Sequence, residues 1–262
     1  MFSYRHAFHA GNHADVLKHM VLIAIMRHLT QKDTALTVFD THAGAGLYRL
    51  DGDYAETSGE AAEGFLRLIA AKPLAGGLAP VIQDYLDLVA SFNTAGSHKV
   101  YPGSPFIIQR LLREDGFEGL KKFLPPPARR ALVLSDPSYE IKTDYARVLA
   151  MVADSLTRFA TGTYAVWYPL IPRPEAHDVP RKLKTLAVKA GKAWLNASLT
   201  VKSSKLTAND AGEVIRPGLP ASGMFVINPP HTLKAALGLA LPQLAKLLGQ
   251  DKHATSTLES AA

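Results

Sequence analysis

The sequence predicts an α/β fold in which a mostly parallel, doubly wound sheet is built from strands that alternate with helices. Two observations carry this prediction. Short runs rich in β-branched and aromatic residues are separated by longer stretches in which apolar residues have helical spacing. The first such run, Leu36–Asp40, ends directly in the glycine-rich turn Thr41–Gly46, as the first strand of a cofactor-binding α/β domain does.

The N-terminal segment, residues 1–47, is expected to hold an arm, a helix and this first strand. Residues 1–11 show no periodicity. Asn12 and Asp15 have the spacing of a capping box, and an apolar stripe then continues to about Gln31. A helix should therefore precede the first strand.

Residues 48–114 are expected to form a helical insertion. No convincing strand is visible in this segment, whereas Gly59–Ala71 and Pro80–Asn93 both have helical spacing. Ser104 and Pro105 form an N-cap and N1 pair for a further helix.

The rest of the domain, residues 115–262, should supply the other strands. Strand-forming runs stand at residues 131–135, 164–168, 198–202 and 224–228, which makes about five strands with the first run. The last dozen residues are expected to be frayed.

The composition excludes several classes of chemistry. The chain of 262 residues has no cysteine, which excludes disulfides, thiolate zinc sites and the thiolate attack needed to methylate C5 of a pyrimidine. Lysine and arginine number 29 against 23 acidic residues, and the formal charge of +6 favours a polyanionic partner. No apolar run could cross a bilayer and no signal-peptide pattern is present, so we expect a cytoplasmic protein without a membrane partner.

The strongest candidate site is Asp136-Pro137-Ser138-Tyr139, directly after the strand at residues 131–135. The Asp136 carboxylate and the Pro137 carbonyl could accept hydrogen bonds from both N–H groups of an exocyclic amine, which would localise the nitrogen lone pair for attack. Tyr139 could stack on an extruded base. The alternative is an Asx turn without a chemical role, which Asp-Pro-Ser forms readily.

The turn that contains His42, Gly44 and Gly46 is the second candidate. Its glycines would let the backbone approach the methionine half of a cofactor closely. The alternative is a strand-to-helix turn whose glycines serve packing alone.

Four histidines, at positions 6, 9, 13 and 19, crowd the N-terminal region. His9 and His13 have the spacing of metal ligands on one helical turn, but no acidic residue completes a familiar hydrolase motif. We favour contacts with RNA or a cofactor and assign no metal site. Surface histidines and a metal site remain the alternatives.

Six motifs in order resemble those of the RlmJ-type 23S ribosomal RNA adenine-N6 methyltransferases. They are FSYRHAFHAGNHADVLKH, FDTHAGAGLY, YPGSP, DPSYE followed by KTDY, RFATGTYAVWYP and ASGMFVINPP, and the resemblance runs from Met1 to about Pro230. It implies a Rossmann-like methyltransferase sheet with a small helical insertion, S-adenosyl-L-methionine as cofactor and 23S ribosomal RNA as partner. We expect a monomer, because nothing in the sequence indicates an obligate oligomer.

The resemblance also implies roles for single residues. Asp136 would be the catalytic acceptor, aided by Pro137 and Tyr139. Tyr4 and His6 in the arm would contact the substrate RNA. The cofactor would be contacted by Lys18, His19, His42, Gly44, Ser104, Asp115, Gly116 and Asp136.

The sequence departs from the family pattern in two places. Ser138 replaces the second proline after the catalytic aspartate, while the proline that supplies the carbonyl is kept. Glu114 runs straight into Asp115, where family members have a strand ending in an acidic residue, a helix and another strand. The sheet is therefore expected to be shortened by two strands from the family's seven, and the acidic residue that holds the cofactor ribose is missing.

Three functions are compatible with these observations. We expect S-adenosylmethionine-dependent N6-methylation of an adenine in 23S ribosomal RNA. The first alternative is a non-catalytic RNA-binding relative that has lost cofactor binding through the missing segment after Glu114. The second is a metal-dependent hydrolase that uses the N-terminal histidines.

Overall fold

A computed structural model of the chain describes residues 9–32, 34–44, 46–51, 59–71, 76–94, 96–112, 126, 129–205, 207–208, 214–215 and 218–261. Tyr4, His6, Asp115 and Gly116, which the sequence analysis assigns to the RNA and cofactor sites, lie outside the described residues.

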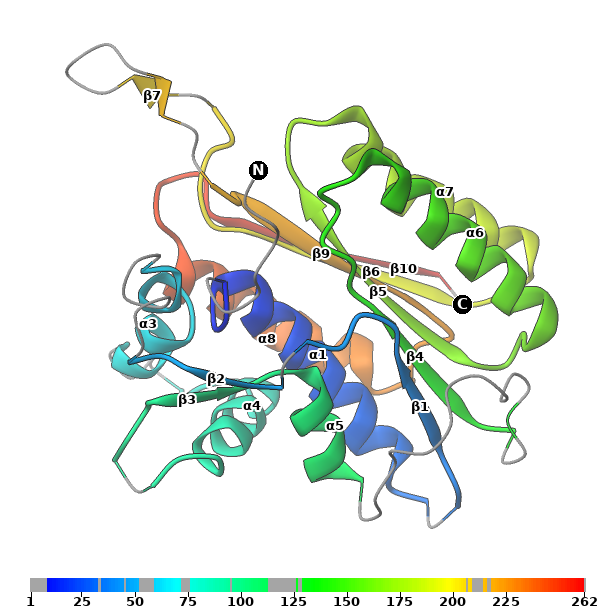
Figure 1. Ribbon diagram of the computed structural model, residues 1–262, viewed down its shortest axis with the longest axis horizontal. Coiled ribbons are helices and arrows are strands. Elements are labelled where there is room, and N and C mark those ends of the chain that lie inside the picture. Colours follow the sequence, from blue (N-terminus) through cyan, green and yellow to red (C-terminus); the bar gives the residue numbers. More distant parts are fainter. Residues whose placement is uncertain are drawn as a thin grey trace.

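A six-stranded sheet with the order β1-β4-β5-β9-β6-β10 forms the centre of the molecule (Figure 1). β1, β4 and β5 are parallel neighbours, and β9 runs antiparallel between β5 and β6. The strands span Thr37–Asp40 (β1), Ala131–Ser135 (β4), Thr163–Leu170 (β5), Trp194–Thr200 (β6), Ala221–Ile227 (β9) and Thr255–Ala261 (β10). Four of these strands point the same way, which confirms the predicted α/β class.

Strand β1 lies at one edge of this sheet. In a doubly wound sheet of the order 3-2-1-4-5-6, two further strands lie outside the first one. Among the described residues the chain instead passes from β1 through the insertion and returns in β4, which pairs directly with β1. Among the described residues, no strand therefore pairs with the outer side of β1.

Helices cover both faces of the sheet (Figure 1). α1 (His13–Leu29) and α8 (Leu233–Leu248) pack on one face, in a core that includes Met20, Leu134 and Leu241. α6 (Lys142–Arg158) and α7 (Pro174–Lys189) cover the other face, in a second core around Val152.

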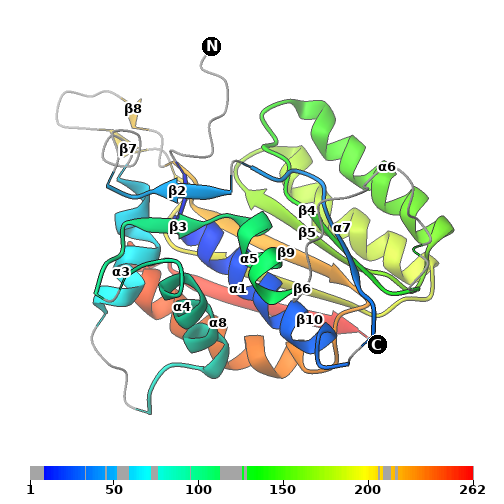
Figure 2. The ribbon, with the colours of Figure 1, turned by 60° about the horizontal axis from the view of Figure 1, so that its bottom comes forward.

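Helix α1 is buried on nearly all sides because it lies between the sheet and the insertion (Figure 2). Its N-terminus is capped as predicted. The Asn12 side chain accepts a hydrogen bond from Asp15 N at 2.9 Å, and the Asp15 carboxylate accepts one from Gly11 N at 3.0 Å. These bonds fix the first turn of α1, which carries Lys18 one turn further on.

The insertion contains the expected helices and, in addition, a two-stranded antiparallel ribbon. Its elements are β2 (Leu47–Arg49), the 3-10 helix η2 (Glu60–Glu63), α3 (Phe65–Ala70), α4 (Pro80–Ala90), β3 (Val100–Pro102) and α5 (Ser104–Leu111). The prediction that the segment holds no strand is wrong for β2 and β3, which pair from Leu47 with Pro102 to Arg49 with Val100. Three-residue strands leave no period-2 signal in a sequence.

The C-terminal residues form the edge strand β10 and are not frayed, so that prediction is wrong. β10 pairs antiparallel with β6 over its whole length, from Thr255 opposite Thr200 to Ala261 opposite Trp194. Leu258 packs on the core beneath α8. The strand is polar in sequence, and its pairing partner supplies the order that its propensity does not predict.

The small strands β7 (Thr207–Ala208) and β8 (Val214–Ile215) pair as a separate ribbon. Over the described ranges, no helix is long and apolar enough to span a membrane.

Candidate active site

The candidate site lies where the parallel strands β1 and β4 end side by side. Asp40 is the last residue of β1 and is in register with Leu134 of β4. Beyond this pair, Thr41 N donates a hydrogen bond to the Leu134 carbonyl at 3.0 Å. The glycine-rich turn and the segment that begins at Asp136 therefore lie together at the carboxyl ends of the parallel strands. This is the end of an α/β sheet at which ligands bind.

A cavity of about 350 Å³ opens at the carboxyl ends of these strands. α1, η2, the segment after β4 and the end of β5 all contribute to its walls. The lining includes Asp15, Lys18, Glu60, Asp136, Tyr139, Trp167 and Arg173. A volume of this size is enough for a single nucleobase with part of a second ligand.

A buried ion cluster of Asp15, Lys18 and Asp136 forms the floor of the site. Lys18 Nζ lies 2.5 Å from Asp136 Oδ2 and 2.7 Å from Asp15 Oδ1, and the three side chains are 5%, 17% and 3% exposed in the order Lys18, Asp136, Asp15. Burial alone would lower the pKa of Lys18, but the carboxylates of Asp136 and Asp15 outweigh this effect and raise the pKa above its usual value. The lysine is thus held as a cation.

Tyr139 sits beside this cluster in a strained backbone conformation. Its φ of 54° lies in the left-handed region, where a bulky residue is rare. The hydroxyl donates to the Trp167 carbonyl at 2.8 Å, and the ring packs against Tyr145 with centroids 4.6 Å apart. Only 2% of Tyr139 is exposed, and Arg173 donates to its carbonyl at 3.4 Å. Strain of this kind is commonly kept at functional sites.

The turn after β1 presents exposed backbone next to a buried carboxyl group. His42 and Gly44 are exposed, whereas Ser104 at the start of α5 is buried and donates to Asp40 Oδ2 at 2.6 Å. Burial raises the pKa of Asp40, and the hydrogen bond from Ser104 acts in the opposite direction. A Cβ at Gly44 would collide with the Tyr48 hydroxyl, so this glycine also serves packing.

The N-terminal histidines do not converge on one point. His9 Nδ1 lies 3.0 Å from Glu60, His13 Nε2 lies 2.9 Å from the Leu219 carbonyl, and His19 Nδ1 lies 2.9 Å from the Tyr101 hydroxyl. No cluster of three histidine or acidic side chains suited to a metal ion occurs in the part of the chain that the structure describes.

The structure brings Lys18, Asp136 and Tyr139 together in one cavity, with Pro137 buried between the last two. His42, Gly44 and Ser104 lie at the neighbouring strand end, and His19 is one residue beyond Lys18 on α1. Asp15, Asp40 and Arg173 also lie at the site, although no sequence motif singles them out as site residues. The Asp15–Lys18 spacing of three residues on one helix was the available signal for the first of them.

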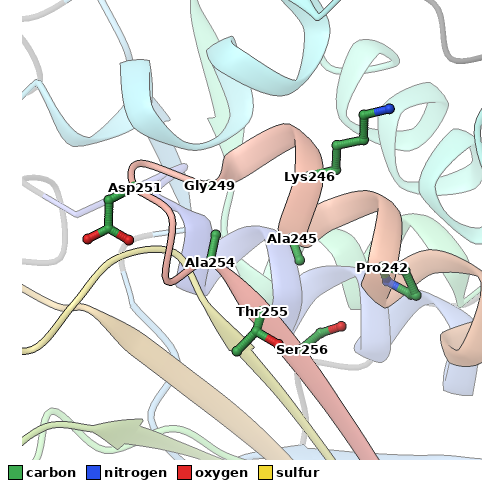
Figure 3. A pocket seen from close by; sticks show the side chains of 8 residues that line it. All are labelled: Pro242, Ala245, Lys246, Gly249, Asp251, Ala254, Thr255 and Ser256. Carbon is green, nitrogen blue, oxygen red and sulfur yellow. The ribbon is translucent and has the colours of Figure 1, made fainter.

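A second hollow, of about 500 Å³, lies between the end of α8 and the start of β10 (Figure 3). Lys246 and Asp251 are the charged side chains in its lining. β10 is at the opposite edge of the sheet from β1. This hollow is therefore remote from the ion cluster, and no chemistry is assigned to it.

Comparison with known proteins identifies the family. A family model described as "RsmJ: Ribosomal RNA large subunit methyltransferase D, RlmJ" matches residues 33–115 and 109–259. The chain is 39% identical to "Ribosomal RNA large subunit methyltransferase J" of Escherichia coli (strain K12), over 93% of each protein. The chain belongs to the RlmJ family. It is accordingly a methyltransferase.

Other relatives agree with this RlmJ-family assignment. "Ribosomal RNA large subunit methyltransferase J" of Haemophilus influenzae is 35% identical over 99% of this chain and 98% of that protein. The crystal structure of protein LPL1258 from Legionella pneumophila superposes with a TM-score of 0.78 at 25% identity, over 97% and 98% of the two chains.

The two matches to the RlmJ family model meet at residues 109–115. The strand, helix and strand that the sequence is expected to lack relative to the family pattern would stand at this junction.

Proposed function

We propose that the protein transfers a methyl group from S-adenosylmethionine to the N6 amine of an adenine in 23S ribosomal RNA. The observation that carries the proposal is the Asp136 carboxylate, which faces a nucleobase-sized cavity while Lys18 holds one of its oxygens. Relatives that are 39% and 35% identical over nearly their whole length are named as methyltransferases of large-subunit ribosomal RNA.

An exocyclic amine of adenine is a poor nucleophile because its lone pair is delocalised into the ring. The Asp136 carboxylate and the Pro137 carbonyl would accept hydrogen bonds from its two N–H groups and localise that lone pair. As the methyl–sulfur bond breaks and the N–C bond forms, the nitrogen would lose one proton, which Asp136 can accept and pass to water. These two acceptors are the chemical contribution of the chain to the reaction.

The target base has to leave its stack to reach Asp136. We propose that Tyr139 meets the base at the wall of the cavity next to Asp136. Only 2% of the residue is exposed, so this contact is confined to the part of the ring that faces the cavity. The hydroxyl bond to Trp167 and the packing against Tyr145 fix the position of the ring before the base arrives. A rigid aromatic platform lowers the entropic cost of capturing the base.

The residues present fit the reacting half of S-adenosylmethionine, whose sulfonium makes its methyl group electrophilic. The carboxylates of Asp15 and Asp136 line the cavity, and carboxylates suit a bound cation. The exposed turn at His42 and Gly44 would hold the methionine half, next to Asp40 and Ser104. We propose that Lys18 and His19 on α1 also contact the cofactor, and that Asp115 and Gly116 contact its adenine.

RNA binding would use the arm and the cavity rim. Tyr4 and His6 are proposed contacts in the arm. Among the cations that line the cavity in the described part of the chain, Lys18 and His9 already contact carboxylates, whereas Arg173 donates to the Tyr139 carbonyl and interacts with the Tyr145 hydroxyl. We propose that Arg173 binds a phosphate next to the target nucleotide. Every proposed group comes from one chain, so a monomer suffices, and a ribosomal RNA substrate implies a cytoplasmic protein.

The test compares the wild-type protein with Asp136→Asn. Titration calorimetry with S-adenosylhomocysteine should show binding to both, because Lys18 keeps Asp15 as its partner in the variant. Transfer of labelled methyl groups to protein-free 23S ribosomal RNA should fall at least about 100-fold in the variant. An undiminished rate would refute the role of Asp136, and a folded wild-type protein that binds no cofactor would refute the proposed reaction.

A further inference from the structure

An exposed aliphatic side chain follows the segment that holds Asp136 and Tyr139. Ile141 is 61% exposed, and it comes directly after Glu140, which lines the cavity. Its side chain therefore stands in solvent beside the candidate site. A single exposed apolar residue is common on protein surfaces, so the exposure of Ile141 gains weight only from the position of this residue in the fold.

That position is one for which isoleucine is poorly suited. Ile141 is the N-cap of α6, with φ −94° and ψ 130°, and its side chain makes no capping hydrogen bond. Serine, threonine, aspartate or asparagine would satisfy a free backbone N–H of the first turn, which isoleucine cannot do. The helices α4, α5 and α7 also lack a capping side chain, but each has a proline in its first turn, whereas α6 begins with Lys142. A residue that breaks a local stability rule next to a cavity is a candidate for a functional role.

The surrounding structure holds Ile141 in place. Asp144 N donates to the Ile141 carbonyl at 3.0 Å, and Lys142 Nζ lies 3.3 Å from Glu175 Oε1 of α7. Two residues earlier, Tyr139 is only 2% exposed. Isoleucine is branched at Cβ and has few rotamers. Its side chain would therefore lose little conformational entropy on contact with a ligand.

We propose that Ile141 is a positioning residue that enters the RNA stack at the place from which the target base is extruded. The inference rests on the proposed N6-methylation, in which the base has to leave its stack to reach Asp136. Tyr139 offers the base only the part of its ring that faces the cavity, so the bases that the target leaves behind need another apolar partner. An aliphatic wedge would replace part of their lost stacking and hinder the return of the base. The substrate would then be RNA in which the target adenine is stacked before the protein binds.

Two single-stranded RNA fragments test this role. Both contain the methylated adenine of 23S ribosomal RNA and have the shortest length that the wild-type protein still methylates. In the second fragment the nucleotides on both sides of this adenine are abasic, so no stack has to be opened. Ile141→Ala should lower kcat/KM by roughly tenfold on the intact fragment and by less than about twofold on the abasic fragment.

Val188→Ala is the matched control. Val188 is also a branched aliphatic residue with 61% exposure, but it lies about four turns along α7 from Arg173. This variant should keep the wild-type kcat/KM on both fragments. Binding of S-adenosylhomocysteine, measured by titration calorimetry, should be the same in the wild-type protein and in every variant.

A substitution that improves the helix separates this role from a purely structural one. Ile141→Ser supplies the missing cap of α6 and should raise Tm by about 2–4 °C. It should nevertheless lower kcat/KM on the intact fragment as much as Ile141→Ala does. Ile141→Met keeps a long apolar side chain and should restore most of the rate.

The inference is overturned if Ile141→Ala and Ile141→Ser keep the wild-type rate on the intact fragment, or if they lose the same factor on both fragments. The proposed methylation stands in either case, because the wild-type protein then still modifies the RNA. A folded wild-type protein that methylates no RNA overturns the proposed function, and the inference falls with it.

Discussion

Lys18 Nζ lies 2.5 Å from Asp136 Oδ2, although the two residues are 118 positions apart in the chain. One comes from α1, which the insertion and the sheet enclose, and the other follows β4. Their contact holds the N-terminal part of α1 against the carboxyl ends of β1 and β4. The position of α1 therefore helps to set the orientation of the Asp136 carboxylate, which is the acceptor in the proposed reaction.

Replacing Lys18 by methionine should destabilise the protein at neutral pH. The substitution removes the ammonium that contacts both Asp15 and Asp136, and losing one partner of a buried ion pair costs about 3–5 kcal/mol in the free energy of unfolding. Urea unfolding measures the change. The double variant with Asp15→Asn should lose less than Lys18→Met alone, and equal losses would show that the charges are not coupled.

The pair of His9 and Glu60 should make stability depend on pH. The hydrogen bond to Glu60 raises the pKa of His9 above 6.5, so this contribution is complete below about pH 6.5 and is lost as pH rises through the folded value. Burial would raise the pKa of Glu60, but the bond from His9 outweighs it and lowers the value below 4.5. That contribution is present above about pH 4.5 and is lost as pH falls through the lowered value.

The pair should therefore be strongest between about pH 4.5 and 6.5. Both side chains are more than a third exposed, so its worth is at most about 1 kcal/mol. His9→Gln should cost more stability near about pH 5.5 than near about pH 9 in urea unfolding. A cost that is independent of pH would contradict the assignment.

Removing the charge of Arg173 should weaken RNA binding without slowing the chemical step. Arg173→Gln should raise the KM for RNA several-fold and reduce the slope of log KM against log salt by about 0.7–1, the value for one lost phosphate contact. Binding of S-adenosylhomocysteine should be unchanged. An unaltered salt slope would mean that Arg173 meets no phosphate.

The order of the C-terminal strand can be tested on its two faces. Leu258 packs on the core beneath α8, whereas Glu259 is exposed on the other face of β10. Leu258→Ala should lower the free energy of unfolding by about 1–2 kcal/mol, and Glu259→Ala should change it by less than about 0.5 kcal/mol. Two equally small effects would indicate that β10 does not pack.

The sequence predicts the parts of the fold that have strong local signals. The sequence predicts the strand at residues 131–135 with its observed bounds, because four apolar residues and Ser135 form a run that ends at Asp-Pro. The sequence also predicts the cap at Asn12, because Asp15 follows it at the spacing of a capping box. Strands β2, β3 and β10 were missed because their pairing partners, and not their own residues, order them.

The sequence predicts which residue of the candidate site would carry the chemistry, but not which side chains contact it. Asp136 stands out because proline and an aromatic residue follow it at the end of a strand. The meeting of Asp15, Lys18 and Asp136 could not be seen, because it depends on how α1 crosses the sheet edge. Arg173 likewise enters the cavity only through the course of the chain after β5.

The most direct test of the account is the identity of the methylated nucleoside. Protein-free 23S ribosomal RNA is incubated with the wild-type protein and S-adenosylmethionine, digested, and analysed by mass spectrometry, with Asp136→Asn in parallel. The account predicts N6-methyladenosine with the wild-type protein and none above background with the variant. A methyl group on a ribose oxygen or a ring carbon, or no methylated product from folded protein that binds cofactor, would contradict it.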